Sequence, residues 1–528
     1  MRTRLALLAG GLAAFAVTAS PAFAQKQGGT LRISHRDNPP SASIHEESTI
    51  SVVQPFMAVF NNLVVFDPKE KINSPDKIVP DLAESWAYNP SQTELTFKLR
   101  SGVKWHDGKP FTAKVVKCTW DALAGKADEK SDLIRKNPRR VWYSNLKEVK
   151  VGSDTEVTFV LDRPQPSFLS ILAAGYSPVY ACHAQGRDMR SKPIGTGPFK
   201  GNESIKLVRN PDYWKKGRPY LDAIDWKIVP NRSTRMLGFV AGEFDMTFDS
   251  DVTFPLLEDI KKQKPDAVCE ARPSNVNQNI LINPEAPPFD KPEVRRALVL
   301  SIDQKPFNDI LFQGNALSGA AMLPPPAGYW GMPKEMLQTL PGFSADIEKS
   351  RAEARKIMEG LGYSKDKPLK VKVSTRNIAI YRDPAVILID QLKNAYIEAE
   401  LDPIDTTVWY TKVQRKDYQL GMNLTGLGVD DPDTAFYENF YSTSDRNYTS
   451  YKNPEIDKLI DQQSAETDRE KRKKIVWEIE KKLAEDGARP VIVHNVAATC
   501  WTPQLKGVVL QHNSIYNGWR FEDMWLDR

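Results

Sequence analysis

Strand-like and helix-like patterns alternate along nearly the whole chain, and this alternation limits the folds that it can adopt. Residues 29–34 (GTLRIS) and the run LKVKVSTR from Leu369 have the composition and alternation of strands. Residues 292–303 and 346–362 have apolar residues at helical spacing, with a proline in the first turn of one and glycines at the end of the other. A long helical region is also predicted over residues 454–487. Interleaved strands and helices predict an α/β fold.

The 528 residues contain no internal repeat and no low-complexity linker. With 41% apolar residues, a chain of this length can bury more than one core, so we expect two or three domains. Because no linker separates them, we expect the chain to cross between domains more than once.

The stretch LTFKLRSGVKWHDGKPFTAKVV at residues 95–116 raises the question of phosphate binding. Its first part alternates like a strand that continues beyond Gly102, the pair DG makes a tight turn, and Thr112 is placed to cap a helix. Five residues rather than four separate Gly102 from Gly108, and Pro110 stands where a P-loop has Ser or Thr. The stretch is therefore interpreted as scaffold.

Motifs of catalysis and metal binding are missing elsewhere in the sequence. The triplet GTG at residues 195–197 lacks the third glycine of a dinucleotide fingerprint, and neither GxSxG nor HExxH occurs. The six histidines are not spaced as metal ligands. We therefore predict that the chain is not an enzyme and that it uses no cofactor and no metal ion.

The first 24 residues have the pattern of an export signal. Arg2 and Arg4 precede an apolar run too short to span a bilayer, and Ala22-Phe23-Ala24 has small residues where signal peptidase requires them. We expect cleavage after Ala24, no lipid anchor because no cysteine follows, and a mature protein in the periplasm.

The charge balance bears on possible partners. The 72 basic and 67 acidic residues give a formal net charge of only +5, which argues for neither nucleic acid nor an anionic membrane as a partner. We expect a monomer that binds a small molecule or peptide.

The four cysteines, Cys118, Cys182, Cys269 and Cys500, are widely spaced and form no CxxC motif. Neither a zinc site nor a thioredoxin-like motif is therefore supported. One disulfide is possible in an oxidising compartment, but the apolar pattern VVKCTWDAL favours a buried free thiol at Cys118.

Seven segments follow one another in the order of a known family. They are GGTLRIS at Gly28, PDLAESWAYNPSQTELTFKLRSGVKWHDGKPFTAKVV at Pro80, PIGTGPFK at Pro193, LVRNPDYWKKGRPYLDAI at Leu207, NPEAPPFDKPEVRRALVLSID at Asn283, DDPD at Asp430 and YKNPEIDKLIDQQ at Tyr451. In these segments the chain resembles the bacterial extracellular solute-binding proteins of family 5, the dipeptide- and oligopeptide-binding group that serves ABC importers.

The resemblance implies a type II periplasmic-binding-protein-like fold with two lobes, a hinge and an extra domain in the N-terminal lobe. Lobe one would combine domain I (residues 25–65, 191–275 and 495–528) with domain II (residues 66–190), and lobe two would be domain III (residues 276–494). The ligand would lie between the lobes, and closure would present a surface to an ABC permease and ATPase complex at the inner membrane.

Candidate ligand contacts follow from the resemblance and from residue chemistry. Relatives that bind peptides hold the amino terminus with an acid four residues before the proline of the segment GLGVDDPD, commonly preceded by Trp. This chain has Gly428 and Thr425 at those positions, so the amine anchor is missing unless Asp430 replaces it. The residues predicted to contact the ligand are His45, Glu46, Arg376, Trp409, Tyr410, Thr425, Gly428, Asp430 and Asp431.

Each candidate also has a structural interpretation. His45 and Glu46 could form an exposed loop, Asp431 could cap a proline turn, and Trp409 and Tyr410 could simply pack. Arg376, or its neighbour Arg382, could anchor a carboxylate or lie on the surface.

Three functions stay open at this point. The chain could be a receptor for peptides or peptide-like solutes, which is the favoured interpretation. It could be a receptor for a non-peptide solute such as a sugar, an opine or a metal chelate, or an exported hydrolase or chaperone-like protein that reuses the fold.

Overall fold

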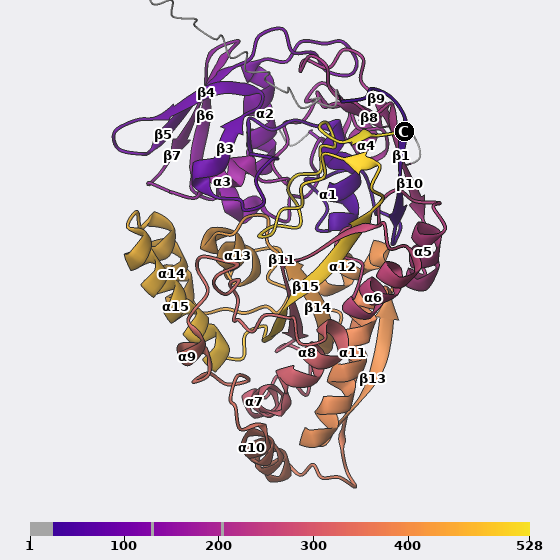
Figure 1. The fold of residues 1–528 in the computed structure, drawn as a ribbon. Helices are drawn as coiled ribbons and strands as arrows, with labels where there is room; N and C mark the ends of the chain where they lie inside the picture. Colours follow the sequence, from indigo (N-terminus) through magenta and orange to yellow (C-terminus); the bar gives the residue numbers. More distant parts are fainter. Residues whose placement is uncertain (1–24, 128–130, 202–204) are drawn as a thin grey trace, which may run out of the picture.

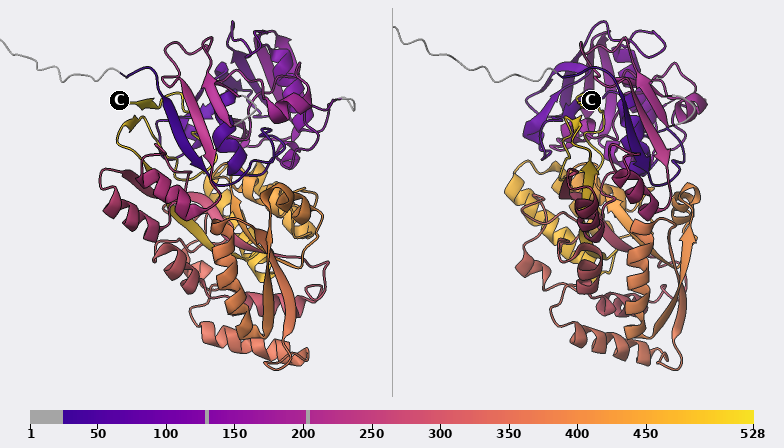
Figure 2. Two further views of the ribbon diagram at one scale, coloured as in Figure 1. Left: turned by 90° about the vertical axis from the view of Figure 1, so that its right-hand side faces the viewer. Right: turned by 45° about the vertical axis from the view of Figure 1, so that its right-hand side comes forward.

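The computed structural model describes residues 25–127, 131–201 and 205–528, so the predicted signal peptide lies outside the described residues. The chain forms two lobes, placed one above the other in Figure 1, and Figure 2 shows the same division from two further sides. The upper lobe is built around two four-stranded sheets, and the lower lobe around one five-stranded sheet. Helices and sheets are mixed throughout, which confirms the predicted α/β fold.

The two sheets of the upper lobe differ in topology. The first has the strand order β1-β10-β9-β8, with β1 parallel to β10 and the other pairs antiparallel. The second has the order β4-β5-β7-β6 and is antiparallel throughout. The strands of this lobe are β1 (Thr30–His35), β2 (Val64–Phe66), β3 (Ile78–Pro80), β4 (Ala83–Tyr88), β5 (Glu94–Leu99), β6 (Leu146–Ser153), β7 (Glu156–Leu161), β8 (Phe199–Gly201), β9 (Lys206–Arg209), β10 (Ala223–Ile228), β16 (Leu505–Lys506) and β17 (Trp525–Leu526).

The sheet of the lower lobe has the order β13-β12-β14-β11-β15. Its strands are β11 (Val268–Ile282), β12 (Leu369–Arg376), β13 (Ile397–Ile404), β14 (Leu420–Gly426) and β15 (Val491–Trp501). Strand β12 is parallel to both β13 and β14, whereas β11 is antiparallel to both of its neighbours. A buried apolar core lies between this sheet and the helices that cover it, including α7 (Pro292–Ser301), α8 (Gln304–Phe312) and α11 (Ala379–Leu392).

The described α-helices are shared between the lobes (Figure 1). They are α1 (Ile50–Phe56), α2 (Ala113–Leu123), α3 (Phe168–Ala173), α4 (Gly186–Ser191), α5 (Arg232–Val240), α6 (Phe254–Gln263), α7 (Pro292–Ser301), α8 (Gln304–Phe312), α9 (Lys334–Leu337), α10 (Ile347–Gly360), α11 (Ala379–Leu392), α12 (Thr406–Gln414), α13 (Pro432–Asn439), α14 (Pro454–Ala465) and α15 (Arg469–Glu485). Among the described residues, no helix is both long enough and apolar enough to cross a membrane.

Strands β11 and β15 join the two lobes (Figure 1). They pair antiparallel from Val268 opposite Trp501 to Asn279 opposite Val491, with an irregular register between Pro273 and Asn277. A second irregularity lies between Gln278 and Asn279, so the lobes are connected by a two-stranded ribbon that loses its regular pairing at two places. The predicted boundaries of domains I, II and III stay predictions, because sheet membership alone does not define units that fold independently.

Several locally predicted elements are present, with two differences. The strand predicted beyond Gly102 ends at Leu99, because only an isolated bridge between Lys104 and Pro110 follows. The helical region predicted over 454–487 is two helices, α14 and α15. The second helix begins after Asp468. The carboxylate of Asp468 caps it by accepting hydrogen bonds from the backbone N–H groups of Glu470 and Lys471.

The prediction of a free thiol at Cys118 is wrong. Cys118 is bonded to Cys182, and Cys269 is bonded to Cys500. Helix α2 carries Cys118 next to the segment that follows Tyr180. The backbone N–H of Tyr180 donates a hydrogen bond to the hydroxyl of Thr119, the residue after Cys118 on the same helix. This proximity depends on tertiary packing across 64 residues, which a local apolar pattern does not reveal.

The disulfide between Cys269 and Cys500 links the two strands that connect the lobes, and it closes a loop with a sequence separation of 231. A crosslink of this kind restricts the unfolded chain, so we expect the double variant Cys269→Ser/Cys500→Ser to lose about 2–4 kcal/mol of unfolding free energy. Urea unfolding under oxidising conditions measures the loss. The variant Cys118→Ser/Cys182→Ser, with a separation of 64, is the matched control and should lose less. An unchanged urea midpoint in the first variant would contradict the expectation.

Candidate functional site

A buried ion pair crosses between the lobes. Asp37 lies two residues after β1 in the upper lobe, and Arg376 is the last residue of β12 in the lower lobe. Arg376 Nη2 lies 2.5 Å from Asp37 Oδ2, which also accepts a hydrogen bond of 2.8 Å from the hydroxyl of Thr406 at the start of α12. Both sheets thus place a charged group at the carboxyl end of a strand, where open α/β sheets commonly bind ligands.

The guanidinium of Arg376 has further partners in the lower lobe. Its Nη1 donates to the hydroxyls of Tyr381, at 3.1 Å, and Tyr410, at 3.2 Å. Burial alone would lower the pKa of Arg376, but Tyr410, Tyr381 and Asp37 outweigh it and raise that pKa. Burial likewise acts to raise the pKa of Asp37, but Arg376 and Arg36 outweigh it and lower that pKa. Both groups are therefore charged, and each compensates the other.

A small cavity of about 30 Å³ lies beside this ion pair. Both lobes line it, and so do the two strands that join them. The lining residues are Arg36, Ser48, Thr49, Ile50, Ser250, Ser274, Val276, Arg376, Ile380, Tyr381, Tyr410, Leu424, Gly426, Asn495, Ala497, Ile515 and Tyr516. A space enclosed by two lobes and their connection is the arrangement that a closing solute receptor requires.

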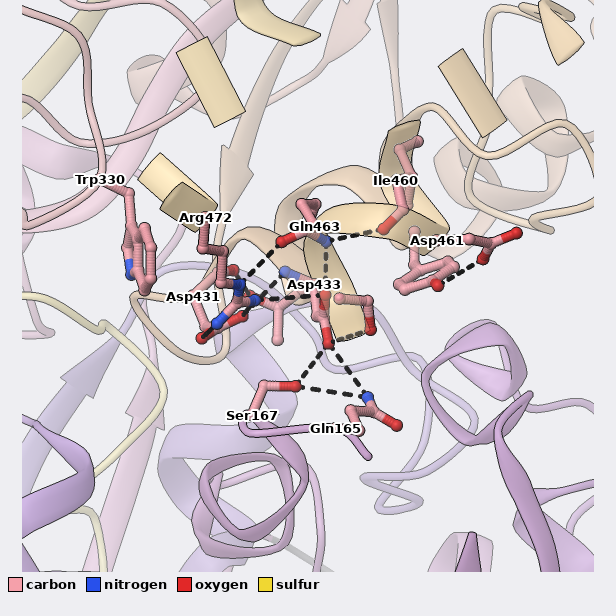
Figure 3. A network of polar contacts seen from close by, with 12 residues as sticks. Gln165, Ser167, Trp330, Asp431, Asp433, Ile460, Asp461, Gln463 and Arg472 are labelled. Carbon is pink, nitrogen blue, oxygen red and sulfur yellow. Dashed lines mark hydrogen bonds and ion pairs between the residues drawn. The ribbon is translucent and has the colours of Figure 1, made fainter. Parts of the chain in front are cut away.

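A second buried network crosses between the lobes at α13 (Figure 3). Asp433 Oδ2 accepts hydrogen bonds from the Ser167 hydroxyl, at 2.5 Å, and from Gln165 Nε2, at 3.1 Å, both in the upper lobe before α3. From α14 of the lower lobe, Ser464 donates to the same oxygen and Gln463 donates to Asp433 Oδ1. The Asp433 side chain is 1% exposed, so this contact between the lobes is buried.

Asp431 holds the start of α13 rather than facing the cavity. Its carboxylate accepts a hydrogen bond from the backbone N–H of Asp433 and forms two bonds with Arg472, at 2.9 and 2.6 Å. Burial raises the pKa of Asp431, and the Arg472 guanidinium limits that increase. This arrangement matches the structural interpretation of Asp431, in which the acid caps the turn at the proline.

The other residues of the GLGVDDPD region lie where the lobes meet. Thr425 is buried on β14, where its hydroxyl accepts hydrogen bonds from Arg489 and Asn279. A Cβ atom at Gly428 would lie 2.9 Å from Cη2 of Trp142 in the upper lobe, so only glycine fits there without movement. Burial raises the pKa of Asp430 to about 7, and its Oδ2 accepts the backbone N–H of Tyr329.

His45 and Glu46 lie in the upper lobe, outside the cavity lining. His45 Nε2 is 2.8 Å from the carbonyl oxygen of Pro178, and burial lowers the pKa of His45 to about 3. Glu46 forms a two-pronged ion pair with Arg190. The exposed loop expected as their structural interpretation is wrong for His45, which is 1% exposed, and both side chains are bonded within the upper lobe.

Trp409 and Tyr410 have different environments although they are adjacent on α12. Trp409 is fully buried in an apolar cluster with Leu281, Val413 and Tyr418. Tyr410 lines the cavity and contacts Arg376. Of the predicted ligand contacts, therefore, the structure places Arg376 and Tyr410 on this cavity, and the role of each predicted residue stays a prediction.

Sequence reasoning missed Tyr381 and Tyr516, which line the cavity, and Asp37, which pairs with Arg376 beside it. A signal was available for Asp37, because a charged residue directly after a predicted strand lies at the sheet edge where ligands bind. Tyr516 belongs to the irregular segment between β16 and β17, and periodicity gives no information about such segments.

Comparison with known proteins places the chain among binding proteins. Residues 77–447 match the family model described as the middle part of bacterial extracellular solute-binding proteins, family 5. The heme-binding protein A of Haemophilus influenzae is 27% identical over 489 residues, covering 85% of this chain and 84% of that protein. A probable di/tripeptide-binding protein 5 of Pseudomonas aeruginosa is 24% identical over 535 residues, covering 94% and 96%.

The fold agrees with a solved structure. The periplasmic binding protein DppA of Helicobacter pylori, determined with the peptide STSA, superimposes with a TM-score of 0.81 at 20% identity. The match covers 95% of this chain and 99% of that protein, which confirms the predicted two-lobed binding-protein fold. The family and the fold are those of binding proteins and not those of enzymes. On the family match, which spans most of its length, the chain belongs to the bacterial extracellular solute-binding proteins of family 5.

Proposed function

We propose that this solute-binding protein is the periplasmic receptor of an ABC importer and that it captures a peptide or peptide-like solute between its lobes. The observation that carries the proposal is the cavity lined by both lobes and by the strands β11 and β15 that join them. Closure would bury the solute, and reopening at the permease and ATPase complex would release it. A micromolar affinity needs only about 8 kcal/mol, which a few polar contacts in a closed cleft supply.

Several parts of the proposal rest on the family and on the sequence. The periplasmic location and cleavage after Ala24 rest on the export pattern of the first 24 residues. We also propose the division into domains I, II and III, a monomeric state and no nucleic acid partner. A pure binding role also requires that bound solute be recovered unchanged, which mass spectrometry of the released solute tests.

A non-peptide solute is the second candidate, because Gly428 stands where relatives that bind peptides have an acidic anchor. Among the similar proteins, one is named as heme-binding and another as di/tripeptide-binding, so the family is not restricted to peptides.

The two candidates predict different results in one experiment. We expect the mature chain, residues 25–528, to show a higher thermal midpoint with at least one pool of di- to pentapeptides. Small-angle scattering should show a smaller radius of gyration with the same pool, because the lobes close. A rise with sugars, opines or metal chelates and with no peptide pool would favour the second candidate. A bound solute without compaction would contradict capture by closure.

A further inference from the structure

A group of buried cationic and aromatic side chains continues from the cavity towards Gly428, and the contacts described so far do not account for it. Tyr516, which lines the cavity, packs against Tyr176 of the upper lobe with ring centroids 4.6 Å apart. The Arg139 guanidinium lies over the Tyr176 ring at 3.6 Å, and the Trp142 ring centroid is 6.3 Å from that of Tyr176. This group reaches Gly428, because the nearest atoms to a Cβ built there belong to Trp142 and Tyr176.

The lower lobe supplies the opposite side of the group. Arg446 is ion-paired with Glu438 of α13, and its charge acts on Tyr176 and Tyr516 across the interface between the lobes. Arg489 lies over the ring of Tyr448 at 5.4 Å, as Arg446 does at 5.8 Å. The side-chain acceptors around Arg489 are neutral oxygens of Asn279, Asn439 and Thr425.

Several hydrogen-bonding atoms of this group have no partner. Within the described ranges 25–127, 131–201 and 205–528, the atoms that lack one are Arg139 Nη1, Trp142 Nε1, Arg446 Nε and the hydroxyls of Tyr448 and Tyr176. All five side chains are at least 97% buried. The first three are obligate donors, so an oxygen-rich acceptor group would satisfy them.

The positive charge of the group is also only partly compensated. Arg139, Arg446 and Arg489 carry three positive charges, and Glu438 is the one carboxylate ion-paired with them in the described part of the chain. Arg139 Nη2 donates to the backbone carbonyls of Ile44 and Glu47. The Glu47 carboxyl is hydrogen-bonded to Ser41, and burial raises its pKa, which weakens it as a counter-ion. Burying unpaired charge costs several kcal/mol, and a bound anion would recover that energy.

We propose that the solute is an anion and that its oxyanion group binds between Arg139 of the upper lobe and Arg446 of the lower lobe, with Trp142 and Tyr448 as further hydrogen-bonding partners. This inference rests on the receptor function proposed above and adds the charge of the solute to it. Guanidinium groups suit carboxylate and phosphate oxygens, which they bind in pairs. Because one arginine comes from each lobe, the anion would also favour closure.

This arrangement explains why residue 428 is a glycine. An acidic side chain at that position would project into the same group of donors and would neutralise the cations that the solute is proposed to meet. Glycine leaves the donors free for the solute and allows Trp142 to approach the backbone. An amine anchor in relatives would thus be replaced here by an anion site.

The charge of the captured solute tests the inference directly. The mature protein is unfolded in guanidinium chloride, refolded by dialysis to remove bound solutes, and incubated with a bacterial cell extract of compounds below 1 kDa. Gel filtration then separates the protein, and mass spectrometry identifies what it retained. We expect the retained solute to carry net negative charge at pH 7 and to have a carboxylate or phosphate group. A neutral or cationic solute would overturn the anion site and leave the receptor role standing, whereas no retained solute would contradict both.

Two variants test the named arginines. The double variant Glu438→Gln/Arg446→Gln removes the ion pair without leaving Glu438 unpaired, and Arg139→Gln keeps a donor for the two backbone carbonyls. Each should reduce retention of the anionic solute at least about ten-fold, the loss expected for one charge-assisted hydrogen bond. The control Arg296→Gln removes an exposed arginine that pairs with Glu353 and should retain as much as the unaltered protein. Full retention by both variants, with unchanged circular dichroism, would overturn the assignment of these residues.

If a glutamine variant does not fold, Arg446→Lys and Arg139→Lys replace it. Each keeps the charge but loses the paired geometry, so we expect weaker but measurable retention. The charge of the solute retained by the unaltered protein decides the inference independently of any variant.

Discussion

Replacing Arg472 by glutamine is expected to lower the free energy of unfolding by about 3–5 kcal/mol at pH 8, the loss typical of a broken buried ion pair. Arg472 is the cation in contact with two buried carboxylates, those of Asp431 and Asp433 (Figure 3). Without it, both carboxylates stay inside the protein with hydrogen bonds alone. Because Asp433 also joins α13 to Ser167 of the upper lobe, the damage should reach the contact between the lobes.

The loss should depend on pH in a defined direction. Burial already raises the pKa of Asp431, and Arg472 opposes this effect, so the variant should raise it further. A carboxyl whose pKa is higher in the folded protein than in the unfolded chain, where it is about 3.9, takes up a proton preferentially when folded. The loss of stability should therefore be smaller at pH 5 than at pH 8.

Urea unfolding at the two pH values measures this effect. Arg469→Gln, on the exposed side of the same helix, is the matched control and should change the free energy of unfolding by less than about 0.5 kcal/mol. A loss in Arg472→Gln that is equal at pH 5 and pH 8 would argue against unpaired carboxylates as its cause.

Replacing Arg376 by leucine should cost a comparable amount, again about 3–5 kcal/mol, because it leaves Asp37 buried without its counter-ion. The double variant Asp37→Asn/Arg376→Leu removes both charges and should recover most of that loss. Since Arg376 and Arg36 lower the pKa of Asp37, the contribution of the pair is fully present above the unfolded pKa near 4 and is lost only as the pH falls further. Without Arg376, burial should instead raise the pKa of Asp37, so the difference between the single and double variants should be smaller at pH 6 than at pH 8.

The same variants decide whether Arg376 anchors the solute. Its guanidinium already contacts Asp37, Thr406, Tyr381 and Tyr410, so we expect it to position the lobes rather than to bind an anion. The double variant should then bind the retained solute within about three-fold of the unaltered protein, less than the ten-fold change that 1.4 kcal/mol would produce. A ten-fold loss of affinity in a folded double variant would instead identify Arg376 as an anchor.

Local patterns predicted the elements of the fold better than they predicted the site. The strand at Leu369–Arg376 and the helix Ile347–Gly360, which Asp346 caps, follow from residues within a few positions of one another. The pairing of Asp37 with Arg376 joins residues 339 positions apart, and no spacing rule connects them. The sequence did not reveal the contacts of His45 and Glu46 either, because their partners, Pro178 and Arg190, lie 133 and 144 positions away.

The resemblance supplied what local patterns could not, namely two lobes with a ligand between them. It also identified Gly428 as the position at which this chain departs from peptide-binding relatives. It did not indicate Arg139 or Arg446, because their importance depends on how the two lobes meet, and that depends on the whole set of packed side chains.

The ribbon formed by β11 and β15 constrains how the cavity can open. The disulfide between Cys269 and Cys500 joins residues that face each other in the register, so the two strands cannot slide past one another there. In the opening proposed above, the irregular stretch between Pro273 and Asn277 is the part of this ribbon where rotation would break the fewest ladder hydrogen bonds. Ser274 and Val276 in that stretch also line the cavity. A solute held in the cavity would therefore contact the same stretch of backbone that the proposed opening would bend.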